Sequence, residues 1–226
     1  MCGIAGILSK SQSNSTIPNL LSILSNLINR GKDGTGIGYF DCHHKMVIRK
    51  KEIAAPQFSE NYNEKNVDCN IAIGHVRLPT IGEISEFNSH PLLDCSGNIA
   101  VIHNGTIKNY SPIKNELSKK GHNFRGTVDS EVLPHLIEEY YDKTNDFEKA
   151  IQKSVKRMEG YFTFSVISNY EPEKVYLYRH HFPLVVLKDD DQTYFSSERK
   201  PLAQLLQKRF RVKHLKKDEL AILSND

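Results

Sequence analysis

Cys2 is the residue whose position most favours covalent chemistry, because it directly follows the initiator methionine. Removal of Met1 is common before a small residue and would leave the Cys2 thiol beside a free α-amino group, whose reference pKa is about 7.7 to 8.0. Roughly a quarter of such amines are unprotonated at cytosolic pH, so the amine can accept the proton of its own thiol. One residue would then supply both nucleophile and base. Taken alone, a cysteine at this position could also be accidental.

Asn104 and Gly105 end an apolar stretch, residues 98–105, that is typical of a buried strand. One interpretation is a hairpin turn, for which Asn-Gly is the strongest short signal. The other is an oxyanion hole, in which the Asn104 side-chain amide and the Gly105 backbone N–H donate to the oxygen of a tetrahedral intermediate. Each such donor is worth about 3 to 4 kcal/mol. The two interpretations are compatible, because a tight turn would hold that geometry.

Arg77 and Asp129 carry opposite charges that could bind one small ligand. Arg77 follows a predicted strand in the segment GHVRLPTIG, residues 74–82, where its planar fork suits bidentate binding of a carboxylate. Asp129, in the segment TVDSEVLPH, would hold an ammonium group. The alternatives are a solvated surface arginine and an N-cap of the following helix. Together, an anion binder and a cation binder describe a site for an α-amino acid.

Glycines accompany two further positions of interest. Gly3 and Gly6 follow Cys2, where side chains would crowd a nucleophile that a substrate must reach. Arg30 opens the segment RGKDG, residues 30–34, a glycine-punctuated turn that lacks the G-x-x-x-x-G-K-[ST] order of a phosphate loop. The simpler interpretation of that segment is a helix C-cap followed by a turn.

No metal or cofactor site is expected from the spacing of ligand residues. The histidine pairs 43–44 and 180–181 would point to opposite sides of a strand, so neither pair is expected to share a metal. His90, in the segment NSHPL, is assigned to the outer shell of the site, with a purely structural role as the alternative. The cysteines form no C-x-x-C pair and are scattered along the chain: Cys2, Cys42, Cys69 and Cys95.

The elements that must position these residues are mixed strands and helices, with polar residues 56–70 as a loop. Strands clustered toward the two ends of the chain with helices between them favour an α+β fold, which we expect to form one domain over residues 1–226. Strands are predicted near 2–8, 35–50 (a hairpin), 71–77, 98–105, 161–168, 174–179, 183–188 and 193–196, followed by a terminal strand pair. Helices are predicted near 17–28, 109–120, 130–142, 146–158 and 198–207.

Composition and charge exclude several classes of function. Lys and Arg (30) nearly balance Asp and Glu (27), and the net charge of +3 is too small to indicate a nucleic acid or an anionic membrane as partner. No apolar run reaches the roughly 18 residues of a membrane span. The first ten residues lack the basic leader and cleavage site of a secretory signal. The sequence therefore predicts a cytoplasmic globular protein.

At these residues the chain resembles the class II glutamine amidotransferases, whose glutaminase domain belongs to the N-terminal-nucleophile hydrolases. The opening MCGIAGIL is similar to that of asparagine synthetases. RGKDGTGIG resembles the family's RG-x-D-x-x-G turn, and GHVRLPTIG resembles a loop of phosphoribosyl-pyrophosphate amidotransferase. The segments SHPL, HNGTIKNY, DSEVLPHLIEEYY and PLVVL…YFSSE resemble glucosamine-6-phosphate synthase. Their common order along the chain makes the resemblance specific.

The resemblance implies a fold and a set of roles. The fold would be a four-layer α/β/β/α sandwich of two antiparallel sheets. Cys2 would form a γ-glutamyl thioester, with Asn104 and Gly105 as the oxyanion hole. The remaining implied roles are binding of the glutamine α-carboxylate by Arg77 and of its α-amino group by Asp129, lining of the substrate loop by Thr80, and support of the nucleophile strand by Gly3 and Arg30.

The chain also departs from this family. Leu78 stands where relatives often carry an aromatic ring, and Ile81 stands where glucosamine-6-phosphate synthases carry histidine. Relatives fuse the glutaminase to a synthase domain that consumes ammonia, and no such domain is expected within these 226 residues. An ammonia-accepting synthase is therefore expected as a separate subunit or as a fused domain missing from this chain. Free release of ammonia is the alternative.

The leading hypothesis is hydrolysis of the L-glutamine side-chain amide to glutamate and ammonia through a Cys2 thioester. A second hypothesis is an amidase with the same N-terminal nucleophile that acts on another amide. The pairing of Arg77 with Asp129 argues against it, because those two residues suit a free amino acid. A third hypothesis is a glutamine-binding subunit without catalysis, which the presence of Cys2, Asn104 and Gly105 makes the weakest of the three.

Overall fold

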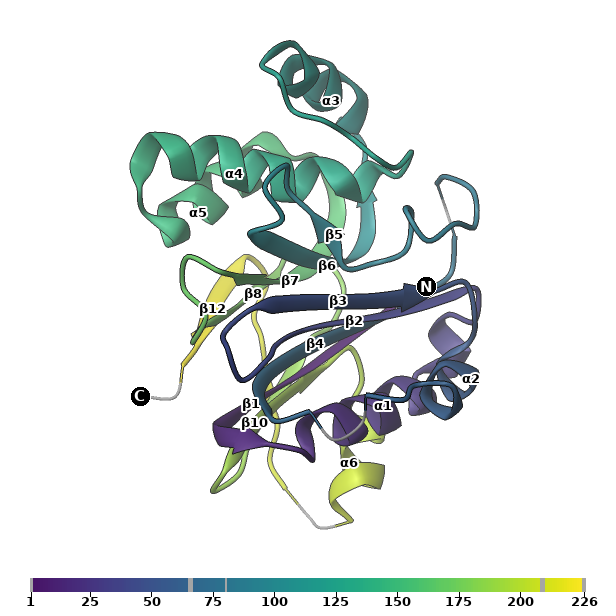
Figure 1. Cartoon of the computed structure of the whole chain (residues 1–226). Helices are drawn as coiled ribbons and strands as arrows, with labels where there is room; N and C mark the ends of the chain where they lie inside the picture. Colours follow the sequence, from purple (N-terminus) through teal and green to yellow (C-terminus); the bar gives the residue numbers. More distant parts are fainter. Residues whose placement is uncertain (1, 65–66, 80, 208–209, 225–226) are drawn as a thin grey trace.

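Two stacked antiparallel sheets form the centre of the computed structural model (Figure 1), which describes residues 2–64, 67–79, 81–207 and 210–224. Within those residues the larger sheet has seven strands, in the order β11 (Lys213–His214), β9 (Val185–Lys188), β10 (Gln192–Ser196), β1 (Gly3–Ser13), β4 (Cys69–Arg77), β2 (Gly34–Phe40) and β3 (Met46–Lys51). The smaller sheet has five, in the order β12 (Glu219–Leu223), β8 (Val175–Arg179), β7 (Gly160–Ser168), β6 (Ile99–Ile107) and β5 (Leu92–Leu93).

Helices cover the outer face of each sheet (Figure 1). The larger sheet is covered by α1 (Thr16–Asn26), α2 (Ala55–Glu60) and α6 (Arg199–Leu206). The smaller sheet is covered by α4 (Val132–Thr144) and α5 (Phe147–Arg157), with α3 (Tyr110–Lys119) beyond α4. Two short 3₁₀ helices complete the fold: η1 (Ile28–Arg30) lies between α1 and β2, and η2 (Asp129–Glu131) lies between α3 and α4. The α+β four-layer arrangement expected from the sequence is confirmed.

Side-chain alternation along the central strands builds the three apolar layers of this fold. In β1, Ile4 and Leu8 pack between the two sheets, whereas Ala5 and Ile7 pack against α1. The same period of two places Ile102 of β6 between the sheets and directs Val101 toward the α4 layer. The described helices are all too short or too polar to cross a membrane.

Three expectations about local structure are wrong. The first residues of the loop expected over 56–70 belong to helix α2 (Ala55–Glu60). The two terminal strands do not pair with each other, because β11 joins β9 in the larger sheet and β12 joins β8 in the smaller one. Asn104 and Gly105 are not a hairpin turn, since β6 continues through them to Ile107 and pairs with β7 along its whole length.

Candidate active site

Strand register brings Cys2 to the end of β4. β1 pairs antiparallel with β4, with Gly3 opposite Val76 and Ile4 opposite His75, so Cys2 meets the residues that leave β4. The backbone N–H of Leu78 donates to the Cys2 sulfur at 3.3 Å, and the thiol donates to the Leu78 carbonyl at 3.3 Å. Burial raises the pKa of the Cys2 thiol, and the Leu78 backbone hydrogen bond opposes that rise. The thiol therefore needs a local base to become a nucleophile.

Gly3 and Arg30 hold the backbone of Cys2 in place. A Cβ on Gly3 would lie 2.9 Å from Cγ2 of Val76 and 3.4 Å from the Arg30 side chain, so the strand packs there without room for a methyl group. Arg30 Nε–H donates to the Cys2 carbonyl at 2.8 Å, and its Nη1 pairs with Glu198 at 2.9 Å. Arg30 ends η1, so this helix delivers a fixed donor to the start of β1.

Asn104 is tied to β1, the strand that follows Cys2, through a serine that the sequence interpretation missed. Asn104 is buried in β6, and its Nδ2 donates to Ser197 Oγ at 3.4 Å. The same oxygen accepts the Ile4 N–H at 3.0 Å, and the Ser197 N–H donates to the Ile4 carbonyl at 2.9 Å. Ser197 thus links the two sheets two residues from Cys2. Its position in the segment YFSSE is the sequence signal that could have identified it.

Gly105 occupies a backbone conformation that only glycine adopts easily. Its φ is +132°, and a Cβ there would lie 1.8 Å from the Tyr161 carbonyl oxygen of the neighbouring strand β7. The special backbone next to Asn104 is therefore a mid-strand distortion rather than the predicted turn.

Arg77 lies buried at the end of β4 and binds the loop that follows it. Its Nη1 donates to the Glu83 carbonyl at 2.9 Å, and its Nη2 donates to the carbonyls of Ile81 and Gly82 at 3.2 and 3.4 Å. Burial lowers the pKa of the Arg77 guanidinium, but an arginine remains charged at physiological pH. Three carbonyl bonds occupy at most three of its five N–H donors, so donors remain for a ligand.

Asp129 does not cap the following helix. It is the first residue of η2, and its Oδ2 accepts the Ile107 N–H at 2.7 Å. The carboxylate is buried and therefore fixed to β6, two residues beyond Gly105. Thr80, the remaining predicted substrate-binding residue, lies outside the described residues.

His90 belongs to a group of three buried histidines rather than to the contacts around Cys2. Its ring centroid is 4.2 Å from that of His75 and 6.2 Å from that of His103. His75 Nε2 is 3.0 Å from the His103 carbonyl oxygen, and His103 Nδ1 is 2.7 Å from Ser130 Oγ. Burial lowers the pKa of each of these imidazoles, that of His75 to about 3. All three are neutral at pH 7.

The depressed pKa of His75 predicts a loss of stability in mild acid. An unfolded histidine titrates near pH 6.5, so the unfolded chain binds an extra proton as pH falls below that value toward 3. His75 alone should cost about 2 kcal/mol of unfolding free energy between pH 7 and pH 5. Urea unfolding at both pH values measures this cost. His75→Gln should show a smaller pH dependence than the parent chain, and His43→Gln, on an exposed turn, should not. Equal pH dependence in all three proteins would contradict the prediction.

The arrangement combines the parts that acyl transfer requires. The Cys2 thiol is hydrogen-bonded to the backbone of Leu78, the residue after the buried Arg77, and Ser197 links the strand that follows Cys2 to the buried side-chain amide of Asn104. A buried carboxylate is fixed to the same strand as that amide. These groups suit an amino acid whose side chain carries a carbonyl that a thiolate can attack.

Comparison with known proteins agrees with this chemistry. A family model described as "Glutamine amidotransferase domain" matches residues 75–204. The "Glutamine--fructose-6-phosphate aminotransferase [isomerizing]" of Sulfolobus acidocaldarius is 34% identical over 198 residues, which are 88% of this chain and 33% of that relative. The protein of the same name from Methanothermobacter thermautotrophicus is 34% identical over 226 residues, 100% of this chain and 37% of the relative.

A solved structure shows the same fold. "Structure of the allosteric regulatory enzyme of purine biosynthesis" superposes with a TM-score of 0.85 at 25% identity, and the match covers 99% of this chain and 47% of that one. The chain thus spans 33% to 37% of the length of the two curated relatives and about half of this structure.

Proposed function

The chain belongs to the glutamine amidotransferase family, and we propose that its own reaction is hydrolysis of the L-glutamine side-chain amide to glutamate and ammonia. The observation that carries the proposal is the contact of Cys2 with Leu78, the residue that follows β4. Ser197 ties Asn104 to β1, the strand that starts directly after Cys2. In this proposal the site requires Cys2 to be the first residue of the mature chain, because its amine is the local base that the buried thiol needs.

The proposed reaction proceeds in two halves. The Cys2 amine accepts the thiol proton, and the sulfur attacks the side-chain carbonyl carbon of glutamine. Asn104 Nδ2 and the Gly105 N–H stabilise the oxyanion that forms. The protonated amine then gives its proton to the departing nitrogen, and ammonia leaves a γ-glutamyl thioester. Water, deprotonated by the same amine, attacks the thioester. Glutamate is released, and the protonated amine returns its proton to the departing sulfur, which restores the free thiol.

Substrate recognition is proposed to rest on Arg77 and Asp129. The free N–H donors of Arg77 suit the α-carboxylate, and the fixed carboxylate of Asp129 suits the α-ammonium group. Thr80 is proposed to line the same loop. Gly3 and Arg30 are proposed to support Cys2, while His90 is proposed to support β4 through its contact with His75.

Arg77→Ala tests this proposal directly, because it separates an amino-acid substrate from any other amide. Hydrogen bonds to charged groups contribute about 1.5 to 3 kcal/mol, so KM for glutamine should rise about 10- to 100-fold, while kcat should change less. Release of glutamate and ammonia by the chain without Met1 gives both constants. Arg49→Ala, which removes an exposed arginine, is the matched control.

A glutamine analogue without the α-carboxylate provides the second arm of that test. The parent chain and Arg77→Ala should use it equally poorly, because the group that Arg77 is proposed to bind is absent. An unchanged KM for glutamine in Arg77→Ala would favour an amidase that acts on another amide.

Ammonia transfer to a synthase is proposed as the purpose of this reaction. Residues 1–226 are proposed to form a glutaminase domain, and the acceptor to lie on a separate subunit or a fused segment. The curated relatives are named for amination of fructose 6-phosphate, which makes a synthase that aminates a sugar phosphate the first acceptor to test. Glutaminase activity that rises when such a synthase and its acceptor are added would support this part of the proposal.

A further inference from the structure

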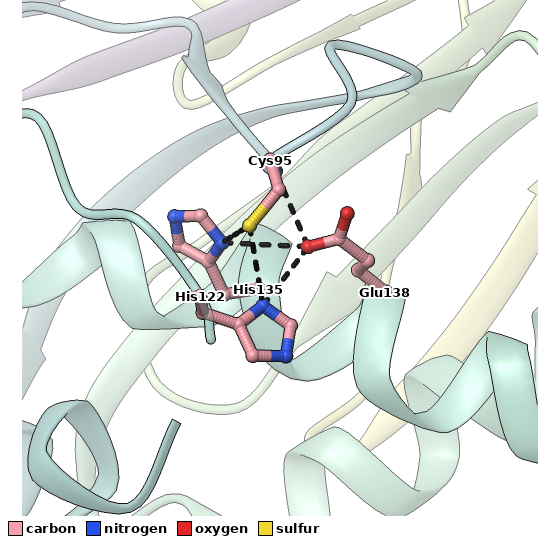
Figure 2. A group of neighbouring side chains, drawn as sticks. All are labelled: Cys95, His122, His135 and Glu138. Atoms are coloured by element: carbon pink, nitrogen blue, oxygen red, sulfur yellow. Dashed lines mark hydrogen bonds and ion pairs between the residues drawn. The ribbon is translucent and has the colours of Figure 1, made fainter. Parts of the chain in front are cut away.

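Four potential metal ligands from separate segments meet beside α4, away from the contacts of Cys2. Cys95 lies in the connection between β5 and β6, and His122 follows α3. His135 and Glu138 lie three residues apart on α4. Figure 2 shows the four side chains pointing toward a common centre, and their ligand atoms all lie within 4.8 Å of one another.

Four of the six separations between these ligand atoms lie close to the edges of a tetrahedral zinc site. Cys95 Sγ lies 3.4 Å from His122 Nδ1 and 3.3 Å from His135 Nδ1. Glu138 Oε2 lies 3.0 and 3.5 Å from the same two nitrogens. Zinc bonds of about 2.0 to 2.3 Å give tetrahedral edges of roughly 3.3 to 3.8 Å. A zinc ion would therefore enter with small outward movements of side chains that already converge.

The surroundings of the cluster also suit a metal. His122 Nε2 lies 3.4 Å from Glu139 Oε2, and a carboxylate on one imidazole nitrogen directs the lone pair of the other toward a metal. The thiolate and the Glu138 carboxylate together would balance the charge of Zn²⁺. Cys95 is exposed whereas His135 is buried, so an ion could enter from solvent on the Cys95 side and be bound by His135 on the buried side.

We propose that Cys95, His122, His135 and Glu138 form a structural zinc site. Four protein ligands leave no open position, which is typical of structural rather than catalytic zinc. The ion would tie the β5–β6 connection and the segment after α3 to α4, the helix that directly follows η2. Sequence spacing predicted no metal, because these ligands are scattered over residues 95–138 and form no recognisable motif. The alternative is a hydrogen-bonded cluster in which Glu138 accepts from both imidazoles and from the Cys95 N–H, 3.2 Å away.

Zinc binding to the whole chain tests the proposal without any assay of glutamine turnover. Protein stripped with a chelator under reducing conditions should bind one zinc per chain in competition with a chromophoric chelator. Cys95→Ser should weaken binding at least about 100-fold, since loss of an outer-shell partner alone costs about 10- to 100-fold. Glu139→Gln, which changes such an outer-shell partner, should weaken zinc binding about 10- to 100-fold. Cys42→Ser, on an exposed turn, should bind as the parent chain does.

Cobalt substitution identifies the geometry and the sulfur ligand. Co²⁺ in this site should show a thiolate charge-transfer band and the intense visible bands of tetrahedral coordination. Both should disappear in Cys95→Ser and persist in Cys2→Ala, which excludes the other candidate thiol. Zinc at about one hundred times its Kd should also raise Tm by about 5 °C or more in the parent chain but not in Cys95→Ser.

Two results would overturn the zinc proposal. One is that the stripped chain, after incubation with zinc, retains none of it on dialysis. The hydrogen-bonded cluster would then be the correct description. The other is equal zinc affinity in the parent chain, Cys95→Ser and His122→Ala. Because metal binding is measured on the protein alone, its failure and the failure of the proposed glutaminase reaction are independent outcomes.

Discussion

Cys2→Ala is expected to lower kcat for glutamine hydrolysis by about 10⁴-fold or more, because the Cys2 sulfur is the group proposed to carry the acyl intermediate. Removal of the nucleophile from enzymes that form acyl intermediates costs on this order or more. The hydrogen bonds with the Leu78 backbone hold the Cys2 thiol at the end of β4, and alanine would place no nucleophilic atom there. Steady-state release of glutamate measures the effect. Cys42→Ala, at an exposed thiol remote from β1, should keep full activity.

Mass spectrometry and covalent labelling test the proposed role of the Cys2 amine. Intact-mass measurement of active protein should show Met1 absent, and a glutamine-like diazoketone should add once, to Cys2. Protein that keeps Met1 should be inactive, because burial raises the pKa of the thiol and no amine is then free to accept its proton. Turnover by protein with Met1 attached, or by Cys2→Ala, would contradict the mechanism. Glutamine binding without turnover in protein that lacks Met1 would instead indicate a non-catalytic subunit.

Asn104→Ala is expected to lower kcat by about 10²- to 10³-fold with little change in KM. The amide of Asn104 would donate to an oxyanion that exists only during the reaction, so its loss affects the transition state more than substrate binding. Removal of one oxyanion-hole donor costs about 2.7 to 4 kcal/mol. Asn169→Ala, at the far end of the same strand pair, is the matched control and should keep full activity.

Ser197→Ala adds a graded outcome to that prediction. Ser197 accepts from the Ile4 N–H and from Asn104 Nδ2, so its hydroxyl is expected to position the amide. Its loss should reduce kcat less than the loss of Asn104 does. The double variant should be no worse than Asn104→Ala alone, because the two residues would act through one donor. Additive losses would show that Ser197 acts independently of Asn104.

Local pattern sufficed for most of the elements. Apolar runs identified the central strands β1 and β6, and apolar positions at helical spacing identified the helices α1 and α4, since such segments must be buried wherever they lie. The short helix α2 was missed because a six-residue helix among polar residues carries too little apolar periodicity. The hairpin expected at Asn104–Gly105 was wrong because long-range pairing with β7 overrides the local turn preference of Asn-Gly.

The sequence by itself predicted Cys2 as the nucleophile, and it determined the family resemblance and the α+β fold class, because these depend on residue types, their order and short-range spacing. Only the tertiary structure decided which residues meet. It joined Ser197 to Asn104 across the two sheets and gave Arg77 three loop carbonyls as partners. It also brought Cys95 to His122, which follows α3, and to His135 and Glu138 of α4. Sheet stacking and helix packing set those contacts, and they cannot be inferred from the spacing of residues along the chain.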